Sequence, residues 1–167
     1  MYAAITLFIV AGLLSICYQD FKSREVYLIN YLILYLLYFI HIVSGGFTIE
    51  PGIIIFNTCI SLIVASMLFI YYLFRYKTGA FHKIRSSIGS GDVLIIPLFI
   101  FSFSPFNFIV FYMISLILSL IFSLTINFFR KNTTIPLAGI QAIVLAACHI
   151  FHITGFINMQ NDIYTLL

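Results

Sequence analysis

The feature that most constrains this chain is a series of six apolar stretches, separated by short polar loops, that runs through the whole sequence. An α-helix rises 1.5 Å per residue, so about 20 apolar residues cross the hydrocarbon core of a bilayer. Backbone polar groups find no water in that core, and helices satisfy them internally. The expected membrane spans are residues 2–19, 26–44, 52–74, 91–104, 107–128 and 135–157.

Composition leaves almost nothing for a soluble domain. Charged residues make up 8% of the chain and hydrophobic residues 63%, whereas roughly a quarter of a soluble domain is charged. We therefore predict an all-α membrane protein with a single transmembrane domain over residues 1–167. The basic residues are few and lie in short loops, which does not suggest nucleic acid as a partner. The three cysteines lie inside apolar stretches without metal-ligand spacing, so we expect no metal site and no cofactor.

The basic residues predict how the spans are oriented. All eight fall in the first, third and fifth loops of the six-span arrangement. Positive charge is concentrated in cytoplasmic loops, so these three loops are expected in the cytoplasm and both termini outside it. The arrangement requires that the short stretch 91–104 also crosses. The eight residues are Lys22, Arg24, Arg75, Lys77, Lys83, Arg85, Arg130 and Lys131.

Two aspartates stand at the cytoplasmic ends of expected spans. Asp20 ends the first span and Asp92 begins the fourth, so both carboxylates are expected at similar depth. Acids are costly near hydrocarbon and often mark functional sites. Two carboxylates in close contact share one proton. The ionised one can then take a proton from an attacking water while the protonated one hydrogen-bonds the scissile carbonyl. This pattern predicts an aspartic peptidase.

The residues before Asp92 favour a site that approaches a substrate closely. Gly89 and Gly91 lack Cβ atoms, so we expect unusual backbone angles and close approach of a substrate strand there. With Ser90 they predict an irregular entry into the fourth span. Two structural alternatives stay open. An aspartate at a helix N-terminus is also typical of a cap, and Asp20 alone is typical of an interfacial residue.

Three stretches of the chain resemble the type IV prepilin peptidases, membrane aspartic proteases of the GxGD group that includes archaeal preflagellin peptidases and presenilin. Residues Asp20–Val26 are similar to the family's first aspartate with its basic loop. Gly89–Asp92 matches the GxGD motif itself, and Ile135–Gly139 is similar to a late proline-containing motif. Two positions differ from the family pattern: Tyr27-Leu28 stands where Pro-Asn or Pro-Asp is usual, and Leu94 where Lys is common.

The resemblance implies a GxGD-type bundle that works without a cofactor in the inner membrane. Its substrate would be a prepilin or pseudopilin, whose leader is cleaved at the cytoplasmic face just before the substrate's own hydrophobic helix. Membrane lipid is the other expected partner, and the oligomeric state stays open. The chain looks like a minimal, peptidase-only form without the family's cysteine-bearing soluble region. The implied site comprises catalytic Asp20 and Asp92, positioning residues Gly89, Ser90 and Gly91, and supporting residues Lys22, Arg24 and Pro136.

Two other functions compete with the peptidase. In a small transporter or channel subunit, Asp20 and Asp92 would be proton or cation sites and the glycine break a binding discontinuity. In an inactive assembly factor they would be an interfacial residue and a cap. His149 and His152 share a helix face at i and i+3, but without a convincing third ligand we expect packing or an interfacial hydrogen bond there.

Overall fold

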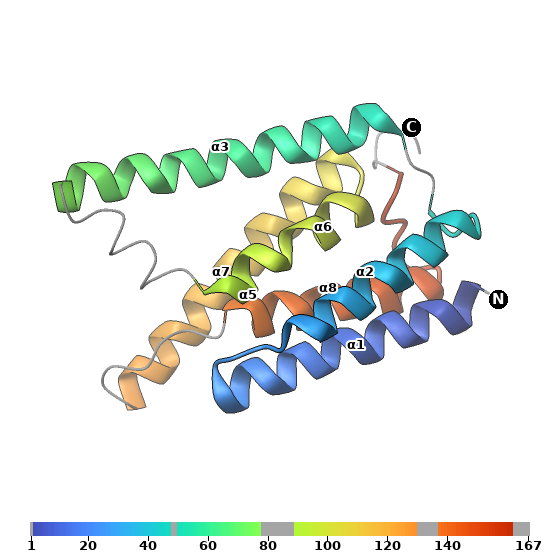
Figure 1. The fold of residues 1–167 in the computed structure, drawn as a ribbon, viewed down its shortest axis with the longest axis horizontal. Helices are drawn as coiled ribbons and strands as arrows, with labels where there is room; N and C mark the ends of the chain where they lie inside the picture. Colours follow the sequence, from blue (N-terminus) through green and yellow to red (C-terminus); the bar gives the residue numbers. More distant parts are fainter. Residues whose placement is uncertain (1, 48–49, 78–88, 130–136, 162–167) are drawn as a thin grey trace.

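The computed structural model describes residues 2–47, 50–77, 89–129 and 137–161. Within these ranges every regular element is a helix, as the sequence predicted (Figure 1). The helices are α1 (Tyr2–Ser23), α2 (Leu28–Val43), α3 (Pro51–Tyr76), α5 (Ser90–Leu94), α6 (Ile96–Ser102), α7 (Pro105–Phe129) and α8 (Leu137–Ile153).

Within the described residues, three helices are long and apolar enough to cross a membrane. They are α1, α3 and the first part of α7, residues Pro105–Phe122. The apolar helices α2, α8 and the α5–α6 pair are shorter. Large apolar side chains are exposed along most of these helices, including Phe8, Phe39, Phe74 and Leu124. An exposed apolar surface of this extent indicates contact with lipid.

The helix ends differ from the expected spans at two places. α1 continues through Ser23, so Asp20 lies inside the helix rather than in the loop after it. Residues 105 and 106 were expected to lie between the fourth and fifth spans, but α7 already begins at Pro105. Proline suits the first turn of a helix because its missing N–H has no partner there in any case. The link between α6 and α7 is therefore only Phe103 and Ser104.

The expected fourth span is broken in two. α5 ends at Leu94 and α6 begins at Ile96, with Pro97 in the first turn of α6. Proline has no N–H to donate, and its ring clashes with the carbonyl four residues earlier. The N–H of Leu98 consequently donates to the carbonyl of Ile95 at 3.1 Å, in the tighter i to i+3 pattern.

The core lies where α1 and α2 pack against α8 and α6. Three alanines spaced four residues apart line the buried side of α8, and such small residues let helices approach closely. On α1, Gly12 makes room for Leu34 of α2, since a Cβ at Gly12 would lie 2.7 Å from a Leu34 methyl group. The alanines are Ala138, Ala142 and Ala146.

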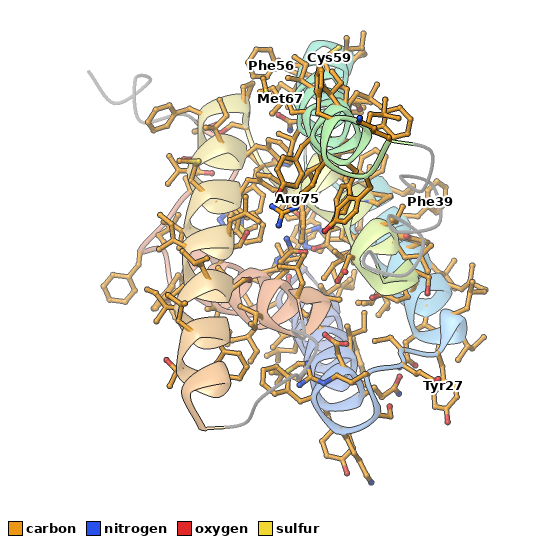
Figure 2. All side chains as sticks on the ribbon, turned by 90° about the vertical axis from the view of Figure 1, so that its left-hand side faces the viewer. Tyr27, Phe39, Phe56, Cys59, Met67 and Arg75 are labelled. Carbon is orange, nitrogen blue, oxygen red and sulfur yellow. The ribbon has the colours of Figure 1, made fainter. Side chains whose placement is uncertain are left out.

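α3 runs along one side of the molecule and buries little of itself (Figure 1). Its buried residue is Asn57, whose Nδ2 donates to the carbonyls of Ile100 at 3.2 Å and Phe103 at 2.8 Å. That amide satisfies carbonyls which the end of α6 leaves without helical partners. Phe56 and Met67 of α3 are exposed, and Figure 2 shows Arg75 extending from α3 towards the middle of the molecule in that view.

Candidate active site

Three helix termini meet at one end of the bundle. The C-terminal part of α1 and the N-terminal ends of α5 and α8 lie together, and α3 ends on the same side (Figure 1). We call this the aspartate end, because α1 contributes Asp20 and α5 contributes Asp92 to it. Lys22, Arg24 and Arg75 lie at or near helix ends on this side.

Asp20 contacts the first turn of α8. Its side chain is 8% exposed, and Oδ2 accepts a hydrogen bond from the backbone N–H of Gly139 at 2.6 Å. The two residues are 119 positions apart in the sequence. The first N–H groups of a helix have no partner within it and carry partial positive charge. Asp20 thus supplies the negative charge that this terminus favours.

Asp92 lies near the same turn of α8. It is the third residue of α5, and its Oδ2 accepts the backbone N–H of Gly89, the residue that precedes the helix, at 3.1 Å. Its carboxylate also interacts with the backbone N–H of Ala138, and electrostatically with Asp20. Two carboxylates from distant parts of the chain therefore lie near the first turn of α8, where Asp20 accepts the N–H of Gly139.

Two tyrosines of α2 hold the helix that carries Asp92. The Tyr31 hydroxyl donates to the carbonyl of Gly91 at 3.0 Å, and the Tyr31 side chain is completely buried. The Tyr35 hydroxyl donates to the carbonyl of Leu94, which the break at Pro97 leaves without its helical donor. Sequence reasoning missed both residues. The available signal was two tyrosines four positions apart in an apolar stretch. They share one helix face, and a buried tyrosine hydroxyl usually has a hydrogen-bond partner.

The expected role of the glycines is corrected in one respect. Gly89 has ordinary extended angles (φ −69°, ψ 144°) and Gly91 is helical, so neither uses the freedom that glycine allows. What matters is space. A Cβ at Gly91 would lie 3.1 Å from the Tyr31 Oη, and one at Gly89 would lie 3.2 Å from Oδ2 of Asp92. The glycines therefore admit groups from within the protein.

The other residues predicted for the site lie less close to the pair. Lys22 extends back along α1, where its Nζ donates to the Tyr18 hydroxyl at 3.0 Å. Arg24 follows α1 with a positive φ of 59° and interacts electrostatically with Asp20. Ser90 is the exposed first residue of α5. Pro136 lies outside the described residues, immediately before α8.

A second polar cluster occupies the opposite end of the bundle. His149 is completely buried, and its Nε2 lies 2.6 Å from the Tyr38 hydroxyl, which also accepts a hydrogen bond from Ser102 at 3.0 Å. His41 Nε2 lies 3.1 Å from Thr6 Oγ1. Across the described part of the chain, no group of three or more histidines, cysteines and acids has an arrangement suited to a metal ion. His149 therefore makes a hydrogen bond, but from a completely buried position and not at an interface as expected.

Comparison with known proteins returned no matching family model, no matching curated protein and no matching solved structure.

Proposed function

We propose that this protein is an aspartic endopeptidase of the membrane, with Asp20 and Asp92 as its catalytic pair. The proposal includes six membrane crossings, with the α5–α6 pair as the fourth, and both termini outside the cytoplasm. Under it the aspartate end faces the cytoplasm, where the positive-inside rule places the eight basic residues.

One observation carries the proposal. Asp20 and Asp92 come from different helices, yet both lie near the first turn of α8, where Asp20 accepts the N–H of Gly139, and the two carboxylates interact electrostatically with each other. Placing a buried acid and a half-buried acid where they interact is unfavourable unless other groups compensate. The N-terminus of α8 provides that compensation. A hydrolase of this type requires such a pair, because one carboxylate acts as a base while the other carries a proton.

The chemistry follows from that shared proton. The ionised carboxylate takes a proton from water, and the water oxygen attacks the scissile carbonyl carbon. The protonated carboxyl hydrogen-bonds the carbonyl oxygen as negative charge develops on it. The tetrahedral intermediate then collapses, the C–N bond breaks, and the leaving nitrogen receives a proton from the pair. The products are a free carboxyl group and a free amine.

The substrate class comes from the resemblance of Asp20–Val26, Gly89–Asp92 and Ile135–Gly139 to prepilin peptidases. We propose a prepilin-like or pseudopilin-like protein whose short leader precedes a hydrophobic helix. Cleavage would occur at the cytoplasmic face of the inner membrane, because the leader meets the pair at the aspartate end. The bond cut would lie just before the substrate helix enters the bilayer.

A second candidate, an inactive assembly factor, is favoured by a specific observation. Each carboxylate already accepts a backbone N–H group, from Gly139 or Gly89, and such contacts stabilise helix ends without any catalysis. The same geometry therefore serves a purely structural role. Activity measurements on conservative variants separate the two functions.

The test uses the full chain reconstituted in lipid vesicles with a single-helix substrate that carries a short basic leader. We expect one cleavage just before the hydrophobic helix. Asp20→Asn and Asp92→Asn should each lower the rate at least about 100-fold, the lower end of what general acid–base catalysis contributes. Asparagine keeps an oxygen that accepts the same backbone N–H, so folding should be largely retained. Glu25→Gln, at an exposed acid beyond the end of α1, is the matched control and should cleave normally.

Full activity in either aspartate variant contradicts the catalytic pair. A wild-type chain that cleaves no leader-bearing substrate, while Asp20→Asn and Asp92→Asn only lower the unfolding temperature, supports the assembly factor instead.

A further inference from the structure

The helix that carries Asp92 is too short to fix its own position. α5 has five residues, and isolated helices of that length are unstable because nucleation costs more than one turn returns. Its orientation must therefore come from contacts with neighbouring helices. The hydroxyls of Tyr31 and Tyr35, one turn apart on α2, supply two such contacts at the carbonyls of Gly91 and Leu94.

The Tyr31 hydroxyl affects Gly91 in two ways: it forms a hydrogen bond with the carbonyl, and it occupies space that a side chain at this position would need. The Tyr31 hydroxyl binds the Gly91 carbonyl at 3.0 Å and lies 3.1 Å from where a Cβ on Gly91 would stand. The next nearest atoms to that Cβ position belong to Ala138 at 3.6 Å and Val26 at 3.9 Å, which are ordinary contact distances. The phenol oxygen is thus the first obstacle to any side chain at Gly91.

Tyr31 also lies near both members of the pair. Its phenol interacts electrostatically with both Asp20 and Asp92, and the ring is fully buried. Because its proton is donated to the Gly91 carbonyl, the hydroxyl holds backbone rather than a carboxylate. A substitution at Tyr31 is therefore expected to move Asp92 indirectly, by changing the position of α5.

We propose that Tyr31 is a positioning residue, which sets the location of Asp92 opposite Asp20 by binding the Gly91 carbonyl. This rests on the proposed peptidase function. The second glycine of the Gly89–Asp92 motif is then required because the Tyr31 oxygen occupies the space where a Cβ would lie.

The experiment is a double-mutant cycle with Tyr31→Phe and Gly91→Ala, measured by cleavage of the leader-bearing substrate in vesicles. Tyr31→Phe removes only the hydroxyl and should lower kcat about tenfold with KM within about twofold, in line with the loss of one buried hydrogen bond. Gly91→Ala should lower kcat about 100-fold in the wild-type background but only about tenfold in the Tyr31→Phe background. The smaller second loss is expected because the obstructing oxygen is absent.

The matched controls replace one member of the pair at a time with a residue that does not contact the other member. Tyr18→Phe removes an exposed hydroxyl of α1, and Gly52→Ala adds a Cβ where no other group lies within 4 Å. Tyr18→Phe combined with Gly91→Ala, and Tyr31→Phe combined with Gly52→Ala, should both be additive. Additive losses in the Tyr31–Gly91 cycle itself overturn the proposal. So does a Tyr31→Phe variant that raises KM at unchanged kcat.

The same cycle is measured by thermal unfolding in detergent, which keeps this inference separate from the peptidase function. If the wild-type chain cleaves nothing, the peptidase function fails. Coupling between Tyr31→Phe and Gly91→Ala in the unfolding temperature then still supports the positioning contact, and additivity refutes it. If Gly91→Ala does not fold, the Tyr31→Phe kinetics decide, and an unchanged kcat overturns the proposal.

Discussion

Replacing Gly139 by alanine tests the contact on which the site depends. Gly139 donates its N–H to Asp20 at 2.6 Å from the first turn of α8. A Cβ there would lie 3.0 Å from Oδ2 of Asp20 and 2.9 Å from the ring of Phe21. The Phe21 ring packs edge-to-face against Phe122 of α7 with centroids 5.2 Å apart, so moving away would give up that contact, although the side chain is 38% exposed. The added methyl group should therefore displace the Asp20 carboxylate.

Three contributions set the size of the effect. Losing a hydrogen bond to a charged group costs about 1.5–3 kcal/mol. Forcing extra atoms into a packed contact costs about 1–3 kcal/mol. Alanine is favoured over glycine inside a helix by at most about 1 kcal/mol. We expect Gly139→Ala to lower the free energy of unfolding by about 3 kcal/mol, which corresponds to a fall of about 6–12 °C in Tm for a chain of this size.

Thermal unfolding in detergent measures the stability, and cleavage in vesicles measures the activity. Gly52→Ala is the matched control, since Gly52 also lies in the first turn of a helix but has nothing within 4 Å of the added Cβ. It should unfold at or slightly above the wild-type temperature and stay active. If Gly139→Ala is as stable and as active as Gly52→Ala, the contact between Asp20 and α8 does not organise the site.

Two further substitutions test polar contacts away from the aspartates, both by thermal unfolding in detergent. Asn57→Leu keeps the side-chain size but leaves two carbonyls at the end of α6 without their donor, so we expect the free energy of unfolding to fall by about 2–4 kcal/mol. Its control is Ser66→Ala, at an exposed residue of α3, which should change stability by less than about 0.5 kcal/mol. Tyr38→Phe removes the partner of the buried His149 and should cost about 1–3 kcal/mol, whereas Tyr18→Phe on the exposed face of α1 should be nearly neutral. Equal stability within either pair contradicts the reasoning for that contact.

Much of the fold follows from apolar length alone. Runs of apolar residues between polar loops predicted helices in six places, and each predicted stretch contains a helix or, at 91–104, a pair of helices. The helix boundaries were harder to predict. α1 extends past Asp20 because a helix continues wherever its N–H groups still find carbonyls, whatever the polarity of the side chains. The break after Leu94 follows from Pro97, a signal that was present in the sequence but was not used.

The candidate site was likewise predictable only in part. Asp20 and Asp92 stand out in the sequence because acids are rare in such a chain, and motif spacing marked Gly89 and Gly91. The residues that contact them were not predicted from the sequence. Gly139 offers only a backbone N–H, which every residue but proline has, and Tyr31 is one of 11 tyrosines. Gly139 belongs to the Ile135–Gly139 motif, but which N–H and which hydroxyl reach the site is decided only when helix packing brings them beside a carboxylate or a carbonyl.

The sequence by itself determined that the chain is helical, apolar enough for a membrane, and marked by two acids at the ends of apolar stretches. Periodicity and hydropathy are local properties, so they can be read from neighbouring residues. Only the tertiary structure decided that Asp20 and Asp92 meet at the first turn of α8, and that Tyr31 fills the space beside Gly91. Those contacts join segments far apart along the chain, and their geometry depends on how α1, α2, α5 and α8 pack together.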